Sequence, residues 1–206
     1  MILFRNGQIC AQGEEIIQDV KMTAGEVLRL CLLVLPEEGE EAGPGGKAVF
    51  NIDIEGPGAD LSLNGLYVCK GNSRVKVSVN LNHKAGGSRS FQQFRGVVSG
   101  SSRSVFDGKI TVSPDAQKTE AYQTNRNLQL SEDAVVETSP QLEIYADDVK
   151  CSHGATVGTL DEDEQFYMRS RGISLEEARR LQVISFLSPV MADLDSEMKD
   201  HVLKFI

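Results

Sequence analysis

Apolar and polar residues alternate with a period of two in several short segments between the N-terminus and about Val157. The alternation is clearest over residues 48–54 and 75–81, whereas residues 27–35 form an almost continuous apolar run. A period of two buries one face of a strand, and Gly, Asn, Asp and Pro clusters between the segments are typical of turns. Similar segments follow at residues 105–112, 128–130 and 142–146. The pattern predicts an all-β region over residues 1–158.

The spacing of these strands leaves the architecture open. Short strands of this kind are compatible with a sandwich, a jelly roll or a stacked parallel β-helix. Apolar strand starts recur at intervals of roughly 20 residues, the length of one solenoid coil, but no sequence motif repeats with them. The spacing therefore favours a β-helix without deciding it.

One segment interrupts the strand pattern. Residues 36–47 are rich in Glu, Gly and Pro and contain no apolar anchor. Such a composition does not bury enough apolar surface to order a chain. We predict a mobile loop between two strands here, not a domain boundary.

Beyond residue 158 the pattern becomes helical. Acidic residues at 161–164 are typical of a helix start, and Gly172 is typical of a helix end. Ser174 with Glu177 matches a capping box for a second helix, and Pro189 suits the first turn of a last one. We therefore predict a C-terminal helical segment over residues 159–206. The second half of the middle helix carries apolar residues on a broad surface that two neighbours must cover. We expect the end of the β-region to be one of them, and the last helix rather than a partner protein to be the other.

Composition places the chain among soluble globular proteins. It has 206 residues, 40% of them hydrophobic, and no 18-residue apolar run, so it can bury a core without disulfides. The N-terminus does not read as a secretory signal, and we expect a cytoplasmic protein. The formal net charge of −9 repels phosphate backbones, which argues against nucleic acid as a partner.

Motifs for autonomous catalysis are not found. The sequence contains no P-loop, no G-x-S-x-G and no H-E-x-x-H, and it has only three histidines. Its four cysteines are scattered without a C-x-x-C pair, so Cys31 and Cys69 are expected to be buried as small apolar residues. A β-helix enzyme acting on polysaccharide would need aromatic platforms, and the chain has no Trp. We do not expect an enzyme.

Three stretches, at residues 106–128, 140–156 and 166–173, resemble the SufB/SufD family of SUF iron–sulfur cluster assembly scaffold proteins. The resemblance covers residues of about 59 to 190. The Cys-Ser-His-Gly sequence at 151–154 is similar to the SufD branch. The resemblance implies a right-handed parallel β-helix followed by C-terminal helices. The helical N-terminal region usual in that family has no counterpart in this sequence.

The resemblance also implies a function and partners. Members of the family are non-enzymatic scaffolds that pair through their β-helices and dock the SufC-type ABC ATPase through their C-terminal helices. A SufB-type or identical chain would then be the partner in a dimer, which would also cover exposed strand edges. By resemblance, the residues expected to bind the ATPase are Phe166, Tyr167, Arg169, Arg171 and Phe186.

Cys151 and His153, which we expect at the end of a strand, are the candidate metal ligands. Residues two apart on a strand face the same side, and a thiolate with an imidazole suits iron or an iron–sulfur intermediate. No further ligand lies nearby in sequence, so a partner chain would complete the site at the interface. The resemblance implies a transient cluster that folding does not require.

A plainer interpretation of these two residues stays open. Cys151 can be a buried cysteine and His153 a residue that caps a β-helix corner. The chain would then be a structural, self-associating β-helix protein with no cluster role. Likewise Gln123, Asn125 and Asn127, which alternate along one strand, are interpreted as amides that hydrogen-bond one another inside a solenoid.

Overall fold

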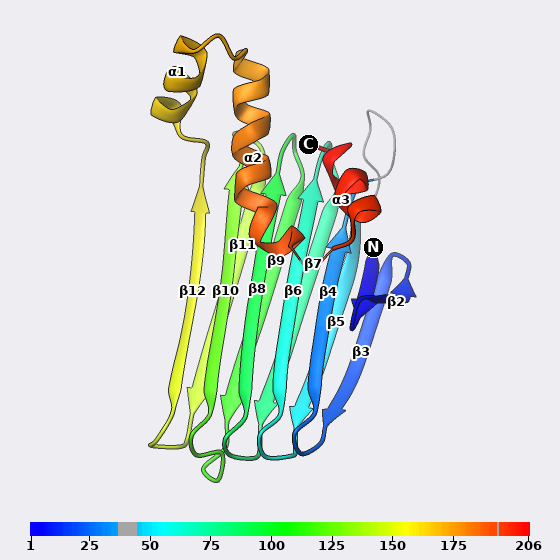
Figure 1. Cartoon of the computed structure of the whole chain (residues 1–206), viewed down its shortest axis with the longest axis vertical. Coiled ribbons are helices and arrows are strands. Elements are labelled where there is room, and N and C mark those ends of the chain that lie inside the picture. The colour runs from blue at the N-terminus through cyan, green and yellow to red at the C-terminus, as the bar shows by residue number, and fades with distance from the viewer. Residues whose placement is uncertain (37–44, 193) are drawn as a thin grey trace.

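The computed structural model describes residues 1–36, 45–192 and 194–206 (Figure 1). In that part of the chain, strands come first and helices last. The strands are β1 (Ile2–Arg5), β2 (Gln8–Gln12), β3 (Glu15–Met22), β4 (Val27–Val34), β5 (Gly45–Ile54), β6 (Asp60–Cys69), β7 (Arg74–His83), β8 (Arg89–Val98), β9 (Arg103–Val112), β10 (Glu120–Gln129), β11 (Val135–Ile144) and β12 (Lys150–Gly158). The helices are α1 (Glu162–Ser170), α2 (Leu175–Met191) and α3 (Ser196–Leu203).

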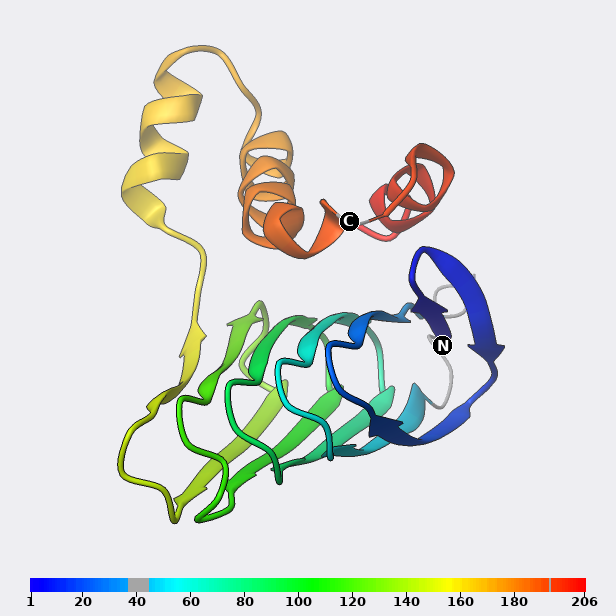
Figure 2. The ribbon, with the colours of Figure 1, turned by 60° about the horizontal axis from the view of Figure 1, so that its bottom comes forward.

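The strands form two sheets that face each other. Sheet A has the order β12-β10-β8-β6-β4-β1-β2, and sheet B has the order β11-β9-β7-β5-β3. From β3 to β12 the chain alternates between the sheets, and neighbours within each sheet are parallel. Each coil thus adds one strand to each sheet around a common lumen (Figure 2). This is a parallel β-helix, which confirms the predicted fold; β1 and β2 join its first end antiparallel.

The coil is longer than the sequence spacing predicted. Side chains that bond across adjacent coils lie about 30 residues apart, as in Asn80–Asn51 at 29 residues and Lys47–Glu15 at 32. The interval of about 20 residues was therefore wrong. Each coil contains two strands, so the distance from one strand start to the next along the chain is shorter than the coil.

The predicted mobile loop over residues 36–47 falls largely on residues 37–44, which lie outside the described residues. Residues 45–47 are not loop, because they belong to β5. Their backbone pairs in register with β7, Gly45 opposite Arg74 and Lys47 opposite Lys76. Pairing with a neighbouring coil therefore extends the strand into a glycine-rich stretch that has no apolar anchor of its own.

The lumen is filled by large side chains that lie over glycines. Gly65 on β6 is opposite Phe94 on β8, and Tyr67 on β6 is opposite Gly96 on β8. A Cβ on Gly65 would overlap the Phe94 ring, and one on Gly96 would overlap the Tyr67 ring. The two aromatic residues thus occupy diagonal positions on adjacent coils, each in space that a glycine leaves free.

Polar side chains inside the lumen bond mainly to one another. The Tyr67 hydroxyl donates to Asn127 and accepts from Asn125 Nδ2 at 3.0 Å. Asn127 donates to Asn125 at 2.7 Å, and Gln123 Nε2 donates to Gln92 Oε1 at 2.8 Å. Burial without such partners is costly. The interpretation of alternating amides that bond one another is confirmed for Asn125 and Asn127, whereas Gln123 bonds Gln92 on the preceding coil instead.

The helices cover one face of the solenoid. In Figures 1 and 2, α2 and α3 lie over the outer face of sheet A, while α1 stands beyond the end of the strands. Buried residues of α2 and α3, including Val183, Leu187 and Val202, form one apolar cluster with Leu33 and Leu66 of sheet A. The residues that bury the apolar surface of α2 belong to this chain, as expected. They lie on the side of the solenoid, however, and not at its end.

Local capping sets the helix boundaries. The Asp161 carboxylate accepts from the Glu164 N–H at 2.9 Å, and the Ser174 hydroxyl accepts from the Glu177 N–H at 3.1 Å. Gly172, at φ +87°, follows α1 and donates to the Arg169 carbonyl at 3.0 Å. A left-handed residue here is favourable for glycine and ends the helix. The first two helix starts agree with the sequence pattern.

The predicted place of Pro189 was wrong. Pro189 lies inside α2, and the last helix begins only after its N-cap Asp195. Proline has no N–H to offer the carbonyl four residues before it. That carbonyl belongs to Ser185, and the Ser188 hydroxyl donates to it at 2.9 Å. A serine beside the proline thus replaces the missing backbone bond.

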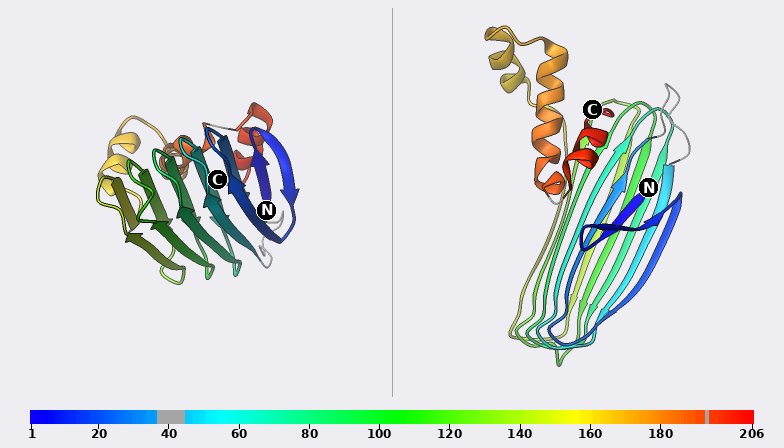
Figure 3. Two further views of the ribbon diagram at one scale, coloured as in Figure 1. Left: turned by 90° about the horizontal axis from the view of Figure 1, so that it is seen from below. Right: turned by 45° about the vertical axis from the view of Figure 1, so that its right-hand side comes forward.

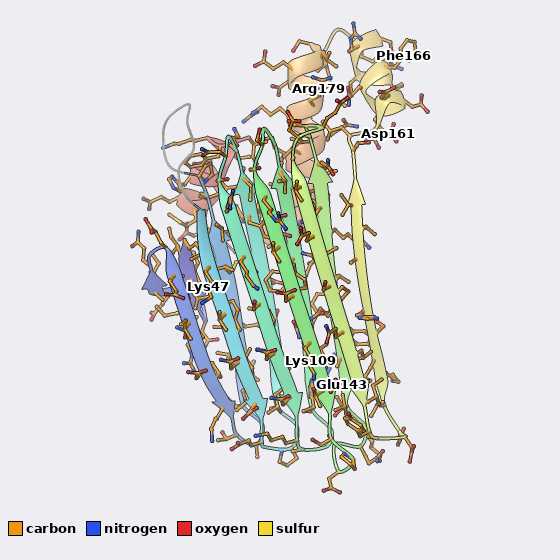
Figure 4. All side chains as sticks on the ribbon, turned by 180° about the vertical axis from the view of Figure 1, so that it is seen from behind. Lys47, Lys109, Glu143, Asp161, Phe166 and Arg179 are labelled. Carbon is orange, nitrogen blue, oxygen red and sulfur yellow. The ribbon has the colours of Figure 1, made fainter. Side chains whose placement is uncertain are left out.

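The outer face of sheet B is charged. Ion pairs run across adjacent coils, as in Lys47–Glu15 at 2.9 Å and Lys109–Glu143 at 2.8 Å; Figure 4 labels three of these four residues along the solenoid. Exposed pairs of this kind add little stability but keep the face solvated. Among the described helices, none is long and apolar enough to cross a membrane.

Candidate functional site

Cys151 and His153 lie on β12, the edge strand of sheet A. In the register with β10, Cys151 is opposite Ala121 and His153 is opposite Gln123. Ala121 and Gln123 are both fully buried in the lumen. Because paired residues in parallel strands face the same side, both candidate ligands continue lumen-facing columns. They lie near the start of β12, however, and not at the end of a strand.

The two residues line an open mouth of the solenoid. Beyond β12 and β11, neither sheet has a further strand in the described part of the chain, so the last coil has no neighbour on one side. Cys151 is half-buried against the lumen core, and His153 is exposed. Figure 3 shows this end with α1 alongside it. The lumen-facing residues of the last coil are Val136, Thr138, Pro140 and Leu142 from β11 and Cys151, His153, Ala155 and Val157 from β12.

The start of β12 is held by charges outside the lumen. Glu120 on β10 accepts from Lys150 at 2.9 Å and lies 3.7 Å from the Arg89 guanidinium. The bond to Lys150 lowers the pKa of the Glu120 carboxyl and raises the pKa of the Lys150 ammonium. The column Arg89, Glu120 and Lys150 therefore places a row of alternating charges on the outer face of sheet A beside Cys151.

The Cys151 thiol is not preactivated. Burial raises its pKa, and a backbone hydrogen bond from Ala121 opposes that rise only partly. A raised pKa keeps the thiol protonated at neutral pH, unlike the thiolates of reactive cysteines. Metal binding to this cysteine must therefore displace a proton, as is usual for thiolate ligands.

This chain alone supplies an incomplete set of ligands. Among residues 1–36, 45–192 and 194–206, no three His, Cys, Asp or Glu side chains gather closely enough to hold a metal ion. A thiolate and an imidazole in adjacent lumen columns can occupy two of the coordination positions of an iron ion. The remaining ligands would have to come from outside these residues.

Two buried polar atoms near the mouth were not anticipated from the sequence. Gln123 Oε1 and Thr138 Oγ1 are buried and have no hydrogen-bond partner within the structure described. The alternation at 123–127 revealed that Gln123 faces the lumen. It did not reveal that one end of its amide is unpartnered, because that depends on the partner across the coil.

Four of the five predicted partner-binding residues lie together on α1 or just after it. Phe166 is 75% exposed and Tyr167 is 59% exposed, so two large apolar side chains face solvent (Figure 4 labels Phe166). Arg169 and Arg171 are also exposed, and the Arg171 guanidinium lies 5.1 Å from the Tyr167 ring centroid. We call these four residues the α1 patch. Exposed apolar clusters with a polar rim are typical of interaction surfaces.

Phe186 is separate from that patch. It lies on α2, half-buried, with the Arg95 guanidinium 5.1 Å from its ring centroid. Arg95 also donates to the Phe186 backbone carbonyl. The structure therefore places Phe186 in the contact between α2 and sheet A.

Two further cysteines and one further histidine are buried in the structure. Cys31 is 6% exposed and Cys69 is fully buried, which confirms both as core residues. His83 is fully buried on β7, with one ring nitrogen 2.7 Å from the Ser88 hydroxyl and the other 2.8 Å from the Ser90 hydroxyl. It does not join the candidate site.

A groove of about 870 Å³ lies between the outer face of sheet A, α1 and α2. Its lining includes Val97, Leu130, Gln165, Arg179 and Val183. The groove opens near the end of β12, whereas Cys151 lies near the start of that strand. It belongs to the helical surface beside the α1 patch rather than to the lumen mouth.

Comparisons with known proteins point to one family. Residues 46–186 match the domain described as SUF system FeS cluster assembly, SufBD core domain. The chain is 41% identical to the Escherichia coli iron–sulfur cluster assembly protein SufD over 151 residues, which cover 73% of this chain and 35% of that protein. It is 37% identical to the Arabidopsis thaliana protein ABCI7, chloroplastic, over 79% of this chain and 36% of that protein. It is 34% identical to the Bacillus subtilis SufD over 70% of this chain and 33% of that protein. The chain thus spans about a third of the length of the curated relatives it matches.

Proposed function

Because the chain belongs to the SufBD core family of SUF iron–sulfur cluster assembly proteins, we propose that it is a scaffold subunit on which clusters are assembled. The observation that carries this proposal is the position of Cys151 and His153. Both face the lumen side at the open end of the β-helix. The chain itself performs no turnover; a separate ATPase supplies the energy.

The cluster is cargo in this proposal. Cys151 gives a thiolate and His153 an imidazole nitrogen, and a partner chain seated on the mouth gives the remaining ligands. In this proposal folding does not depend on the cluster, because the chain's own apolar residues fill the lumen against which Cys151 packs. After anaerobic treatment with iron and sulfide, the double variant Cys151→Ala, His153→Ala is expected to retain less of both than wild type.

The partner in this proposal is a SufB-type or identical β-helix that covers the last coil. Strands β11 and β12 end their sheets, and exposed apolar residues occur at both ends of this last coil: Ile144 and Tyr145 at the end of β11, and Val157 near the end of β12. Unpaired strand edges with apolar neighbours favour strand addition from another chain. Sedimentation at high micromolar concentration tests this: we expect a dimer, and a monomer would overturn it for the isolated chain.

The second proposed partner is the SUF-type ABC ATPase, docked on the α1 patch. The patch stands apart from the solenoid, and the groove bounded by α1, α2 and sheet A lies beside it. Aromatic residues with neighbouring arginines are the side chains most enriched at binding hot spots.

Co-expression with that ATPase tests the docking. Affinity capture should recover a complex with wild type, and the double variant Phe166→Ser, Tyr167→Ser should lose it. Both side chains are exposed, so the variant is expected to fold; unchanged far-UV circular dichroism checks this. The matched control is Leu181→Ser, an exposed apolar residue on α2. Equal capture of the variant and wild type would contradict docking on this patch.

A second candidate function rests on the packing of Cys151 against the lumen core. A half-buried thiol with a raised pKa is also the state of an inert core residue. The chain would then be a structural, self-associating β-helix. Equal iron in wild type and in the Cys151→Ala, His153→Ala variant would favour this alternative.

A further inference from the structure

The Gln123 amide is bonded at one end only. Gln123 is fully buried on β10, and its Nε2 donates to Gln92 Oε1 on the preceding coil at 2.8 Å. The nitrogen and the oxygen of an amide diverge from the same carbon. With the nitrogen facing Gln92 on β8, the oxygen is left without a partner in the described structure; the coil that follows β10 in sheet A is β12.

The residue on that next coil in the same column is His153. Gln92, Gln123 and His153 are opposite one another in consecutive parallel strands of sheet A. Parallel strands lie about 4.8 Å apart, so side chains in one column reach each other. Gln123 Oε1 is therefore a buried acceptor without a partner, one strand away from an exposed imidazole.

The fold provides space for this amide on the opposite sheet. A Cβ added to Gly108 on β9 would overlap the Gln123 amide. Any other residue at 108 would push the amide out of the lumen. A buried amide oxygen that is left unpaired costs about 1–3 kcal/mol. A cost of this size suggests that the oxygen acquires a donor in another state of the protein.

From this geometry we infer that Gln123 is a positioning residue for His153. The Gln123 oxygen accepts one imidazole N–H, which leaves the other ring nitrogen unprotonated and directed to the mouth. Metal-binding histidines are commonly held in this way by a hydrogen bond from the second nitrogen. The inference rests on the proposed function of His153 as a ligand. It adds a residue that does not touch the metal.

The tautomer of His153 tests this inference without any metal. Nitrogen NMR of the full-length chain, at a pH where the ring is neutral, reports which ring nitrogen carries the proton. We expect a single tautomer in wild type and a mixture of both in Gln123→Leu. Gln123→Glu keeps an acceptor oxygen, and the Gln92 amide can turn to donate its own unpartnered Nε2–H to it. That variant is expected to restore the single tautomer. His153→Ala identifies the signal among the three histidines.

The same variants are then compared with Co²⁺ as the probe. Loss of a group that orients a ligand typically weakens metal binding about 10- to 100-fold. We expect that loss in Gln123→Leu and its recovery in Gln123→Glu. The matched control is Ser104→Ala, a buried lumen hydroxyl on β9 outside the Gln92–Gln123–His153 column, which should bind like wild type.

The outcomes separate this inference from the proposed function. Identical tautomers in wild type and Gln123→Leu overturn the inference, whatever the Co²⁺ affinity. So does unchanged Co²⁺ affinity in Gln123→Leu when Cys151→Ala, His153→Ala has lost binding. Failure of the proposed function has a different signature, because the Cys151→Ala, His153→Ala variant then binds Co²⁺ as wild type does.

Discussion

Arg95 on β8 holds Phe186 on α2 in two ways: its guanidinium lies 5.1 Å from the ring centroid, and it donates to the backbone carbonyl. Burial lowers the pKa of Arg95, and the nearby charge of Arg126 lowers it further. The cation is therefore partly removed from water at the junction of helix and solenoid. This contact joins the helical segment, which carries the α1 patch, to the sheet that ends at Cys151.

Arg95→Ala is predicted to loosen α2 from sheet A. The cation–π contact and the charged hydrogen bond together are worth about 1–3 kcal/mol. Amide hydrogen exchange in α2 should accelerate relative to the lumen strands. Arg126→Ala is the control, because this exposed arginine is opposite Arg95 on the next coil and its removal relieves repulsion. Unchanged exchange in Arg95→Ala would show that the apolar cluster alone holds the helix.

Gly96→Ala is predicted to destabilise the solenoid. The added methyl group would overlap the Tyr67 ring and the Asn127 amide oxygen in the lumen. Overpacking of this kind costs about 1–3 kcal/mol. Urea unfolding followed by circular dichroism measures the loss. Gly154→Ala is the matched control, since nothing lies near a Cβ there. Equal unfolding free energies for the two variants would contradict this packing.

Stability is predicted to fall in weak acid because of His83. Burial lowers its pKa from 6.5 to about 4. The unfolded chain therefore binds a proton that the folded chain does not between those values. The contribution of the neutral His83 to the free energy of unfolding is fully present above pH 6.5 and is lost as the pH falls toward about 4. The loss is on the order of 3 kcal/mol.

Substitution of His83 removes this dependence. The unfolding free energy of His83→Gln should change less than that of wild type between pH 7 and pH 4.5, although it is lower at pH 7 because the Ser88 and Ser90 hydroxyls lose a partner. The control Ser104→Ala, which removes a buried lumen hydroxyl and no titratable group, should keep the wild-type slope. A wild-type slope in His83→Gln would assign the acid sensitivity to other groups.

Ser174→Ala is predicted to shorten α2 at its start. The hydroxyl accepts the Glu177 N–H, and loss of such an N-cap costs about 1 kcal/mol. Ser174→Asp keeps an acceptor and should retain stability. Thermal unfolding of the two variants measures the difference. If both melt alike, the Glu177 N–H is satisfied by water as well as by the side chain.

The sequence predicted the β class and the first two helix starts because both depend on local signals. Alternation at residues 75–81 reflects one buried face, and Ser174 caps a helix through atoms three residues away. The coil length was missed because nothing local marks which strands share a sheet. Pro189 was misplaced because the compensating bond comes from Ser188, a residue that is common at helix ends and in turns as well.

The candidate site was predictable only in part. Cys151 and His153 were found by their spacing and by resemblance, and the register shows that they share the lumen side. The unpartnered oxygen of Gln123 was not predictable, because it requires knowing that Gln92 takes the other end of the amide. The raised pKa of Cys151 also depends on burial by residues distant in sequence.

Iron and sulfide per assembled complex test the central claim most directly. The chain is co-expressed with a SufB-type chain and the SUF-type ATPase, isolated without oxygen, and compared with its Cys151→Ala, His153→Ala variant. Subunit stoichiometry by mass shows that both complexes are intact. We predict that the wild-type complex holds iron and sulfide and that the variant complex, at the same stoichiometry, loses most of both. Equal iron and sulfide in the two complexes would contradict the account and leave Cys151 and His153 as structural residues of the last coil.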